Sequence, residues 1–175
     1  MLLSPIQNGA VLTEGIWQQV RPVITQVFGV NKEIYKQFGL EGHNGIDFRA
    51  AVGTPIFAAH DGIVTKIRKD SEGYGWHIRI RSEFNPKETI YAHLSEFLVK
   101  EGQSVGMGDK IGLSGNTGFS TGPHLHFGWR KLIPSLDKNL KDWAVANYDN
   151  GYFGWINPLE VLLTWKGSLT NSTHD

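Results

Sequence analysis

The sequence of 175 residues contains no cysteine. This absence excludes disulfide bonds, thiolate metal sites and a cysteine nucleophile. A metal ion, if the protein holds one, must therefore be bound by histidine, aspartate or glutamate side chains. The absence of cysteine is compatible with any redox compartment.

The sequence also lacks a surplus of charge of either sign. It has 17 Lys and Arg residues against 17 Asp and Glu residues. Without a basic surplus, we expect no general affinity for nucleic acid. Hydrophobic residues make up 40% and charged residues 19%, which is typical of a globular domain and not of a disordered chain. The length is that of about one domain and is sufficient to bury a core.

Long apolar segments are missing as well. No run of about 18 apolar residues is present, so we expect no membrane span. The first residues, MLLSPIQNG, have neither the basic start nor the apolar stretch of a secretory signal peptide. We therefore expect that, if the protein works outside a cytoplasm, another route delivers it.

Glycine, in contrast, is abundant. The 21 glycines and 7 prolines separate short segments rich in Val, Ile, Phe, Tyr and Trp. Such spacing predicts many short strands joined by tight turns, and thus a mainly β protein with few short helices. Residues 76–81 alternate between apolar and polar side chains, as in a strand with one buried face. The expected strands are residues 23–28, 45–48, 54–59, 63–68, 76–81, 89–94, 110–113 and 125–129.

Local turn and helix signals complete this expectation. His60-Asp61-Gly62 contains the Asp-Gly pair of tight hairpins, which predicts a hairpin between residues 54–59 and 63–68. Residues 15–20 are compatible with one or two helical turns. Asn157 as N-cap and Pro158 at the first position predict a short helix over residues 158–163. We assign no firm structure to residues 132–152 and expect the polar tail 167–175 to fray.

The seven histidines carry most of the chemical information, and the first grouping is His43-Asn44-Gly45-Ile46-Asp47. An imidazole and a carboxylate are both suitable zinc ligands. Positions four apart share a face on a helix and on a strand, and the neighbouring glycines favour the extended form. Taken alone, a His-x-x-x-Asp spacing arises by chance more often than it marks a metal site.

The second grouping is His124-Leu125-His126-Phe127. On a strand the two histidines project to one side and the two apolar residues to the other. Two adjacent imidazoles can bind a metal or transfer protons, and the alternative is an exposed polar face. The local sequence around His93, YAHL, favours a buried structural histidine. The remaining histidines, which we interpret as structural or solvent-exposed, are His60, His77 and His174.

Three of these segments, taken in order, resemble the lysostaphin/LytM-type metallopeptidases, which are zinc endopeptidases that cut peptidoglycan cross-bridges and stems. The segments are His43-x-x-x-Asp47, residues 91–95 (YAHLS) and residues 115–127 (GNTGFSTGPHLHF). The last motif is long and specific, and the resemblance covers about residues 24–130. It implies a small antiparallel β-sheet domain with an active-site groove walled by loops, in agreement with the strands expected above.

The resemblance implies a role for five residues. His43, Asp47 and His126 would be the ligands of a zinc ion, and His93 and His124 the catalytic histidines. Three protein ligands leave a position open for water, whose pKa the metal lowers towards about 7. The two histidines would orient or deprotonate this water and pass a proton to the leaving amine. All five positions match, although the sequence does not decide which histidine is the general base.

Three further residues are candidates for substrate binding. Tyr35 lies upstream of the first ligand, as does a transition-state tyrosine of some relatives; otherwise it packs. Asn116 and Ser120 would shape the loop before His124, and Asn116 would also contact substrate. The aromatic residues that either form a substrate platform or pack an extension onto the domain are Trp143, Tyr148, Tyr152, Phe153 and Trp155.

The sequence thus predicts an N-terminal extension (1–22), a peptidase domain (23–130) and a C-terminal extension packed on it (131–175). The expected function is zinc-dependent cleavage of peptidoglycan peptides by a monomer, at the cell wall outside the cytoplasm, with secreted, periplasmic or phage delivery. Alternatives are a non-catalytic peptidoglycan-binding or hydrolase-activating module and a zinc enzyme with another amide substrate. A carrier domain is disfavoured, because the turn at His60-Asp61-Gly62 lacks an attachment lysine. The bond that is cut, glycyl or D-amino-acid, stays open.

Overall fold

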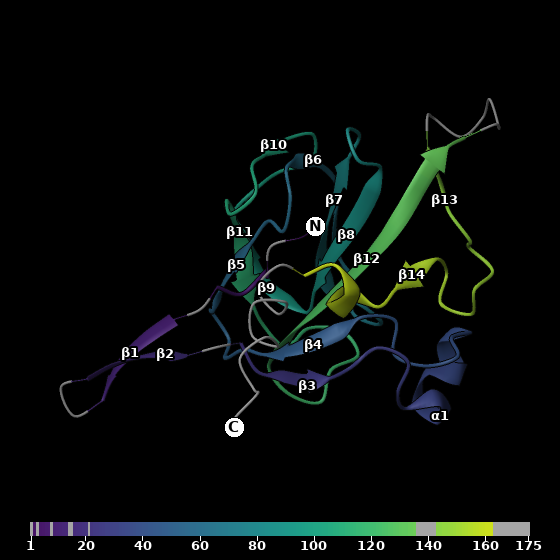
Figure 1. The fold of residues 1–175 in the computed structure, drawn as a ribbon. Coiled ribbons are helices and arrows are strands. Elements are labelled where there is room, and N and C mark those ends of the chain that lie inside the picture. Colours follow the sequence, from purple (N-terminus) through teal and green to yellow (C-terminus); the bar gives the residue numbers. More distant parts are fainter. Residues whose placement is uncertain are drawn as a thin grey trace, which may run out of the picture.

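A computed structural model describes residues 2, 4–7, 9–13, 16–20, 22–135 and 143–162. In agreement with the sequence, the described chain is mainly β, with short helical turns (Figure 1). None of its helices is long and apolar enough to cross a membrane. The elements are β1 (Gly9–Thr13), β2 (Ile16–Val20), β3 (Ile24–Gln26), α1 (Lys32–Tyr35), η1 (Lys36–Phe38), β4 (Ile46–Arg49), β5 (Pro55–Phe57), β6 (Gly62–Lys69), β7 (Trp76–Ser82), β8 (Lys87–Ala92), β9 (Leu94–Phe97), β10 (Ser104–Val105), β11 (Lys110–Ser114), β12 (His124–Pro134), β13 (Trp143–Val145), β14 (Trp155–Ile156) and η2 (Pro158–Glu160).

The main sheet is antiparallel and is organised around the long strand β12. Its order is β10-β6-β7-β8-β12-β4-β3, and β13 and β14 pair with the later part of β12. Figure 1 shows β12 crossing the molecule between β4 at one end and β13 at the other. A second sheet has the order β5-β11-β9. Because β12 pairs with both β4 and β8, three stretches that are distant in sequence become neighbours.

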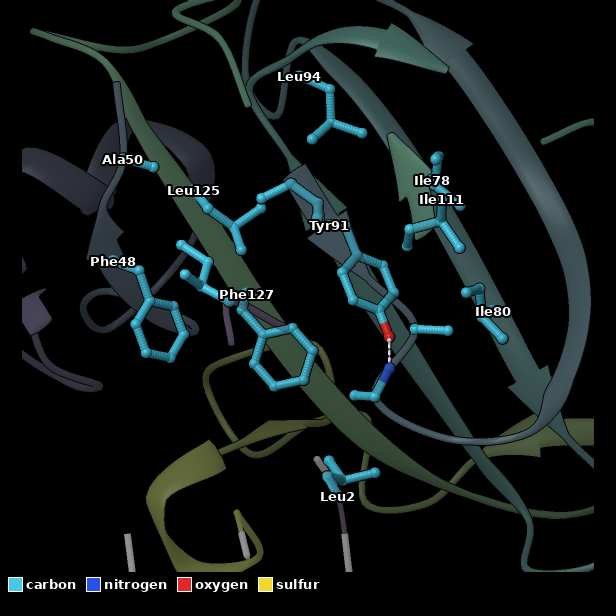
Figure 2. Packing of buried hydrophobic residues seen from close by; sticks show 14 of the residues in the cluster. Leu2, Phe48, Ala50, Ile78, Ile80, Tyr91, Leu94, Ile111, Leu125 and Phe127 are labelled. Carbon is cyan, nitrogen blue, oxygen red and sulfur yellow. Dashed lines mark hydrogen bonds between the residues drawn. The ribbon is translucent and has the colours of Figure 1, made fainter. Parts of the chain in front are cut away.

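The hydrophobic core lies between these two sheets. Figure 2 shows side chains from β4, β7, β8, β12 and the second sheet meeting there. Leu125 and Phe127 of β12 are fully buried, as the alternation of this segment predicts. Burial of such side chains stabilises the fold by about 1.5–3 kcal/mol each. Their burial on one face directs His124 and His126 to the other face of the strand.

The predicted hairpin at His60-Asp61-Gly62 is wrong. Strand β5 pairs with β11, whereas β6 pairs with β7 and β10, so this segment connects the two sheets. Asp61 accepts a hydrogen bond from the backbone N–H of Met107 at 2.6 Å, a long-range contact that no local turn rule predicts. At Gly62, a Cβ would clash with the carbonyl oxygen of Arg81. The glycine therefore permits a close approach of strands instead of a tight turn.

Other local expectations have mixed outcomes. Residues 16–20 form β2, paired antiparallel with β1, and not helical turns; only two residues separate these strands, so pairing satisfies their backbone groups. Residues 132–134 extend β12. The helix after Asn157 is confirmed as the 3₁₀ turn η2, with the Asn157 side chain accepting from the N–H of Leu159, and it ends at Glu160. The predicted frayed tail, including His174, lies outside the described residues.

A chain of polar groups is enclosed in the core beside Tyr91. The Tyr91 hydroxyl accepts from the backbone N–H of Ala59 at 2.8 Å, as Figure 2 shows. The Thr89 hydroxyl lies 3.1 Å from this oxygen and 3.0 Å from His60 Nε2. His60 Nδ1 faces the carbonyl oxygen of Asp61 at 2.8 Å. His60 is thus a buried structural histidine with a partner at each ring nitrogen.

Acid should destabilise the protein through His60. Burial lowers the pKa of His60 to about 4, from 6.5. Between these pH values the unfolded state binds more protons, so the free energy of unfolding falls as the pH falls, by about 3 kcal/mol in total. Urea denaturation at a series of pH values measures this loss. Over the same pH range, the free energy of unfolding of His60→Gln should fall by about 3 kcal/mol less than that of the wild type. Equal losses in the two proteins would contradict the prediction.

Candidate active site

Strand pairing brings together residues of the two sequence motifs. In the register of β4 with β12, Asp47 lies opposite His126. Side chains at directly opposed positions of an antiparallel pair project from the same face. Because His124 is two residues from His126, it shares this face. Asp47, His124 and His126 therefore gather on the side of the sheet that faces away from Leu125 and Phe127.

His43 reaches the same face from the loop before β4. Its backbone N–H donates to the carbonyl of Val30, and its carbonyl accepts from the N–H of Gly29. The loop passes very close to β12: a Cβ at Gly45 would lie 2.5 Å from the carbonyl oxygen of Phe127 and 2.6 Å from the ring of His126. Only glycine fits this position, which explains the glycine between the two predicted ligands.

Three side-chain atoms form a compact triangle. His43 Nε2 lies 3.0 Å from Asp47 Oδ1 and 2.9 Å from His126 Nδ1, and the latter two atoms are 3.1 Å apart. A tetrahedral zinc ion with bonds of about 2.0–2.2 Å holds its ligand atoms about 3.3–3.6 Å apart, slightly more than the edges of this triangle. All three residues are buried. The triangle is therefore close in size to one face of a tetrahedral metal site.

The protonation of the triangle also suits a cation. His43 Nδ1 lies 3.1 Å from the carbonyl oxygen of Val27, so this nitrogen carries the proton and Nε2 presents a lone pair. Burial would raise the pKa of Asp47, but the close imidazole rings of His126 and His43 outweigh it and hold the pKa well below its usual range. Burial lowers the pKa of His126 to about 4, so its ring is neutral near pH 7. A divalent ion would satisfy these converging electron-rich atoms.

The two remaining histidines of the motifs lie beside this triangle. His93 Nδ1 is 2.7 Å from the carbonyl oxygen of Thr117, and His124 Nδ1 is 2.8 Å from that of Gly122. Both Nδ1 atoms act as donors, so each Nε2 is left as an acceptor. The centroids of the His93 and His124 rings are 4.5 Å apart, and His124 Nε2 lies 3.6 Å from Asp47 Oδ2. Burial lowers the pKa of His93 to about 3, which keeps this imidazole neutral.

The triangle and this histidine pair open into a cleft of about 290 Å³. Tyr35 lines the cleft, with its ring 5.3 Å from that of His43, and its hydroxyl accepts from Gln26 Nε2 at 2.7 Å. Ser120 also lines it and donates to Asn116 Oδ1 at 2.6 Å. Asn116 is not among the described lining residues. The structure thus brings together seven of the eight predicted residues, and Asn116, which is exposed, contacts Ser120 from outside the lining.

Tyr74, which lines the cleft, was not predicted to belong to the site. The Tyr74 ring lies 5.3 Å from that of His126, and its hydroxyl accepts from Asn44 Nδ2 at 2.6 Å. Tyr74 is flanked by Gly73 and Gly75, both with positive φ, and this glycine pair was the available signal. Of the aromatic residues foreseen either as a substrate platform or as packing, Phe153 lines the cleft, whereas Trp155 is buried.

A His–Asp–His triangle and two further imidazoles, gathered in one cleft on a β-sheet, define a metal-dependent hydrolase type of site. The comparison with protein families agrees with this class. The chain belongs to peptidase family M23, whose sequence profile matches residues 41–142. The peptidases of this family are metal-dependent. The resemblance seen in the sequence is therefore confirmed.

Individual relatives are consistent with this assignment. An uncharacterized metalloprotease of Haemophilus influenzae is 39% identical over 124 residues, which are 69% of this chain and 26% of that protein. The peptidoglycan DD-endopeptidase ShyA of Vibrio cholerae is 47% identical over 85 residues, which are 49% of this chain and 19% of that protein. The catalytic domain of the antimicrobial peptidase lysostaphin from Staphylococcus simulans superimposes with a TM-score of 0.54 at 30% identity, over 69% of this chain and 78% of that domain. The chain thus spans about a fifth to a quarter of the curated relatives' length.

Proposed function

We propose that this protein is a zinc-dependent endopeptidase that hydrolyses peptide bonds in the stem or cross-bridge of bacterial peptidoglycan. The convergence of His43, Asp47 and His126 on one point is the observation that carries the proposal. Similarity to a relative named a peptidoglycan DD-endopeptidase supports the substrate class, and in the proposal the protein acts at the wall, outside the cytoplasm. In the proposal the protein acts as a monomer.

Zinc is the ion that this donor set fits best. Two imidazoles and one carboxylate without sulfur form a catalytic type of zinc site, with one position left for water or substrate. When bound, the ion supplies a Lewis acid that polarises the carbonyl and lowers the pKa of water. In the proposal His43 Nε2, Asp47 Oδ1 and His126 Nδ1 hold it. The hydrogen bond from His43 Nδ1 to the Val27 carbonyl fixes the orientation of that ring.

The proton transfers are assigned to the second pair of histidines. Both present an unprotonated Nε2, because their Nδ1–H groups donate to the backbone carbonyls of Thr117 and Gly122. One of them accepts a proton from the attacking water, and a protonated ring then donates to the leaving amine. The backbone hydrogen bonds hold both rings in the required tautomer through these steps.

Tyr35 and Ser120 are proposed to contact the substrate. Burial, reinforced by the charge of Asp47, raises the pKa of Tyr35 to about 12, so its hydroxyl keeps its proton. Gln26 donates to the oxygen of this hydroxyl, which leaves the proton available to the oxyanion that forms at the substrate carbonyl. Asn116 orients Ser120 through their 2.6 Å hydrogen bond.

Digestion of purified peptidoglycan tests the proposed function. We expect the zinc-loaded protein to release new amino termini, because the site hydrolyses amide bonds, and mass spectrometry of the products identifies the bond. Walls with glycine bridges and walls with direct cross-links are compared in parallel. A chelator should abolish the release, and added zinc should restore it. Unchanged hydrolysis after the metal has been removed would rule out the mechanism, and binding without any hydrolysis would favour a non-catalytic module.

A further inference from the structure

One side of the cleft is an apolar surface, which we call the aromatic wall and define as Ile34, Phe38, Phe119 and Phe153. The rings of Phe38 and Phe119 meet edge to face with their centroids 5.1 Å apart. Phe153 packs at Gly39, where a Cβ would lie 3.5 Å from its Cζ atom. These contacts join three separate segments of the chain into one continuous surface next to Tyr35.

The side chains of the aromatic wall pack together, yet much of their surface remains exposed to solvent. The exposed fractions of Ile34, Phe119 and Phe153 are 47%, 44% and 37%. Large apolar side chains that stand together at a catalytic cleft indicate a surface that a ligand covers. Because the wall is continuous with the proposed catalytic centre in one cleft, the occupant that fits it is the substrate peptide itself.

The charges of the cleft limit which substrate side chains can bind at the aromatic wall. Among the described lining residues, only the Asp47 side chain is charged, and it belongs to the metal triangle. The lining described contains no lysine, arginine or glutamate. A charged substrate side chain placed here would lose its water without gaining a partner, which is strongly unfavourable.

Most of the aromatic wall comes from outside the part of the chain that matches the family. The matched residues are 41–142, whereas Ile34, Phe38 and Phe153 lie before and after them. The metal triangle and the two histidines lie inside the match. Most of the wall therefore comes from segments that flank the matched part of the chain, and connecting segments held on a rigid scaffold are suited to set specificity.

We propose that the aromatic wall is a subsite for an apolar, uncharged side chain of the peptide, next to the bond that is cut. This inference rests on the proposed function and adds a selectivity to it. An aliphatic side chain is preferred because it buries apolar area against the phenylalanines. Glycine offers no such area, and a charged side chain is rejected because it finds no partner.

Matched peptides test this selectivity by binding, so that the result does not depend on turnover. The probes are N-acetylated, C-amidated tripeptides Ala-X-Ala in which X is leucine, glycine or glutamate, titrated into the zinc-loaded protein by NMR. We expect the leucine peptide to bind about 10-fold or more tightly than the glycine peptide, and the glutamate peptide to bind most weakly. Phe153→Ala should reduce the leucine preference to within about 2-fold.

Two further variants make the test specific. Phe84→Ala is the matched control, because Phe84 is fully exposed and is not among the cleft-lining residues, and it should keep the wild-type preference. Phe119→Lys places a cation on the wall, so the glutamate peptide should bind this variant more tightly than the glycine peptide does. Misfolding cannot produce such a gain in affinity.

The outcomes separate this inference from the function on which it rests. Equal affinities for the leucine and glycine peptides in the wild type, or a preference that survives both Phe153→Ala and Phe119→Lys, would overturn the subsite even if peptidoglycan is cut. A leucine preference that the wall variants remove supports the subsite. If peptidoglycan then resists digestion, the proposed hydrolysis fails while the binding site stands.

Discussion

The variant His126→Ala is expected to lose metal and hydrolysis together. His126 Nδ1 is one corner of the triangle, 2.9 Å from His43 Nε2 and 3.1 Å from Asp47 Oδ1. Two protein ligands bind zinc far more weakly than three. Loss of a residue that only supports a ligand already costs about 10–100-fold in metal affinity, so loss of a ligand itself should exceed 100-fold. Elemental analysis after dialysis against a weak chelator measures the zinc content.

His60→Gln is the matched control for this experiment. It also removes a buried imidazole, but His60 binds Thr89 and the Asp61 carbonyl in the core and is not one of the cleft-lining residues. This variant should keep one zinc ion and full hydrolysis. Thermal unfolding in excess chelator checks that His126→Ala still folds. Stoichiometric zinc in a folded His126→Ala protein would show that the triangle is not the metal site.

The variant His124→Ala should keep its metal and lose its turnover. His124 lies beside the triangle, with Nε2 3.6 Å from Asp47 Oδ2, and contributes no corner to it. Removal of a side chain that transfers protons in the reaction lowers the rate by about 10²–10⁴-fold. The zinc content, measured in the same samples as the rate of amino-terminus release, should stay near that of the wild type.

Ser120→Ala is the matched control on the same loop. The Ser120 hydroxyl lies 3.2 Å from His124 Nδ1, but the Gly122 carbonyl, at 2.8 Å, still orients the ring when the serine is removed. We therefore expect a loss of less than about 10-fold in this control. Loss of zinc from His124→Ala would mean that this histidine is a ligand, and the assignment of roles within His124-Leu125-His126 would have to be reversed.

The sequence supports some of these expectations better than others. The alternation in residues 124–127 correctly separates two histidines from two core residues, because the side-chain period of a strand depends only on the local backbone. The Asp-Gly hairpin prediction fails at Gly62, because that glycine is needed for contact with Arg81, a residue far along the chain. Residues 16–20 fail as a helix, because pairing with β1 overrides a weak local preference.

The sequence by itself determined the mainly β class, the shared face of His124 and His126 on their strand and, through motif resemblance, the five residues of the proposed centre. Only the tertiary structure decided that His43 and His126, 83 positions apart, place their ring nitrogens 2.9 Å from one another. It alone showed that Tyr74 packs by His126 and that Phe38, Phe119 and Phe153 share one cleft. The physical reason is that periodicity and turn chemistry act over a few neighbouring residues, whereas a site is assembled by strand pairing and packing between segments that local patterns do not connect.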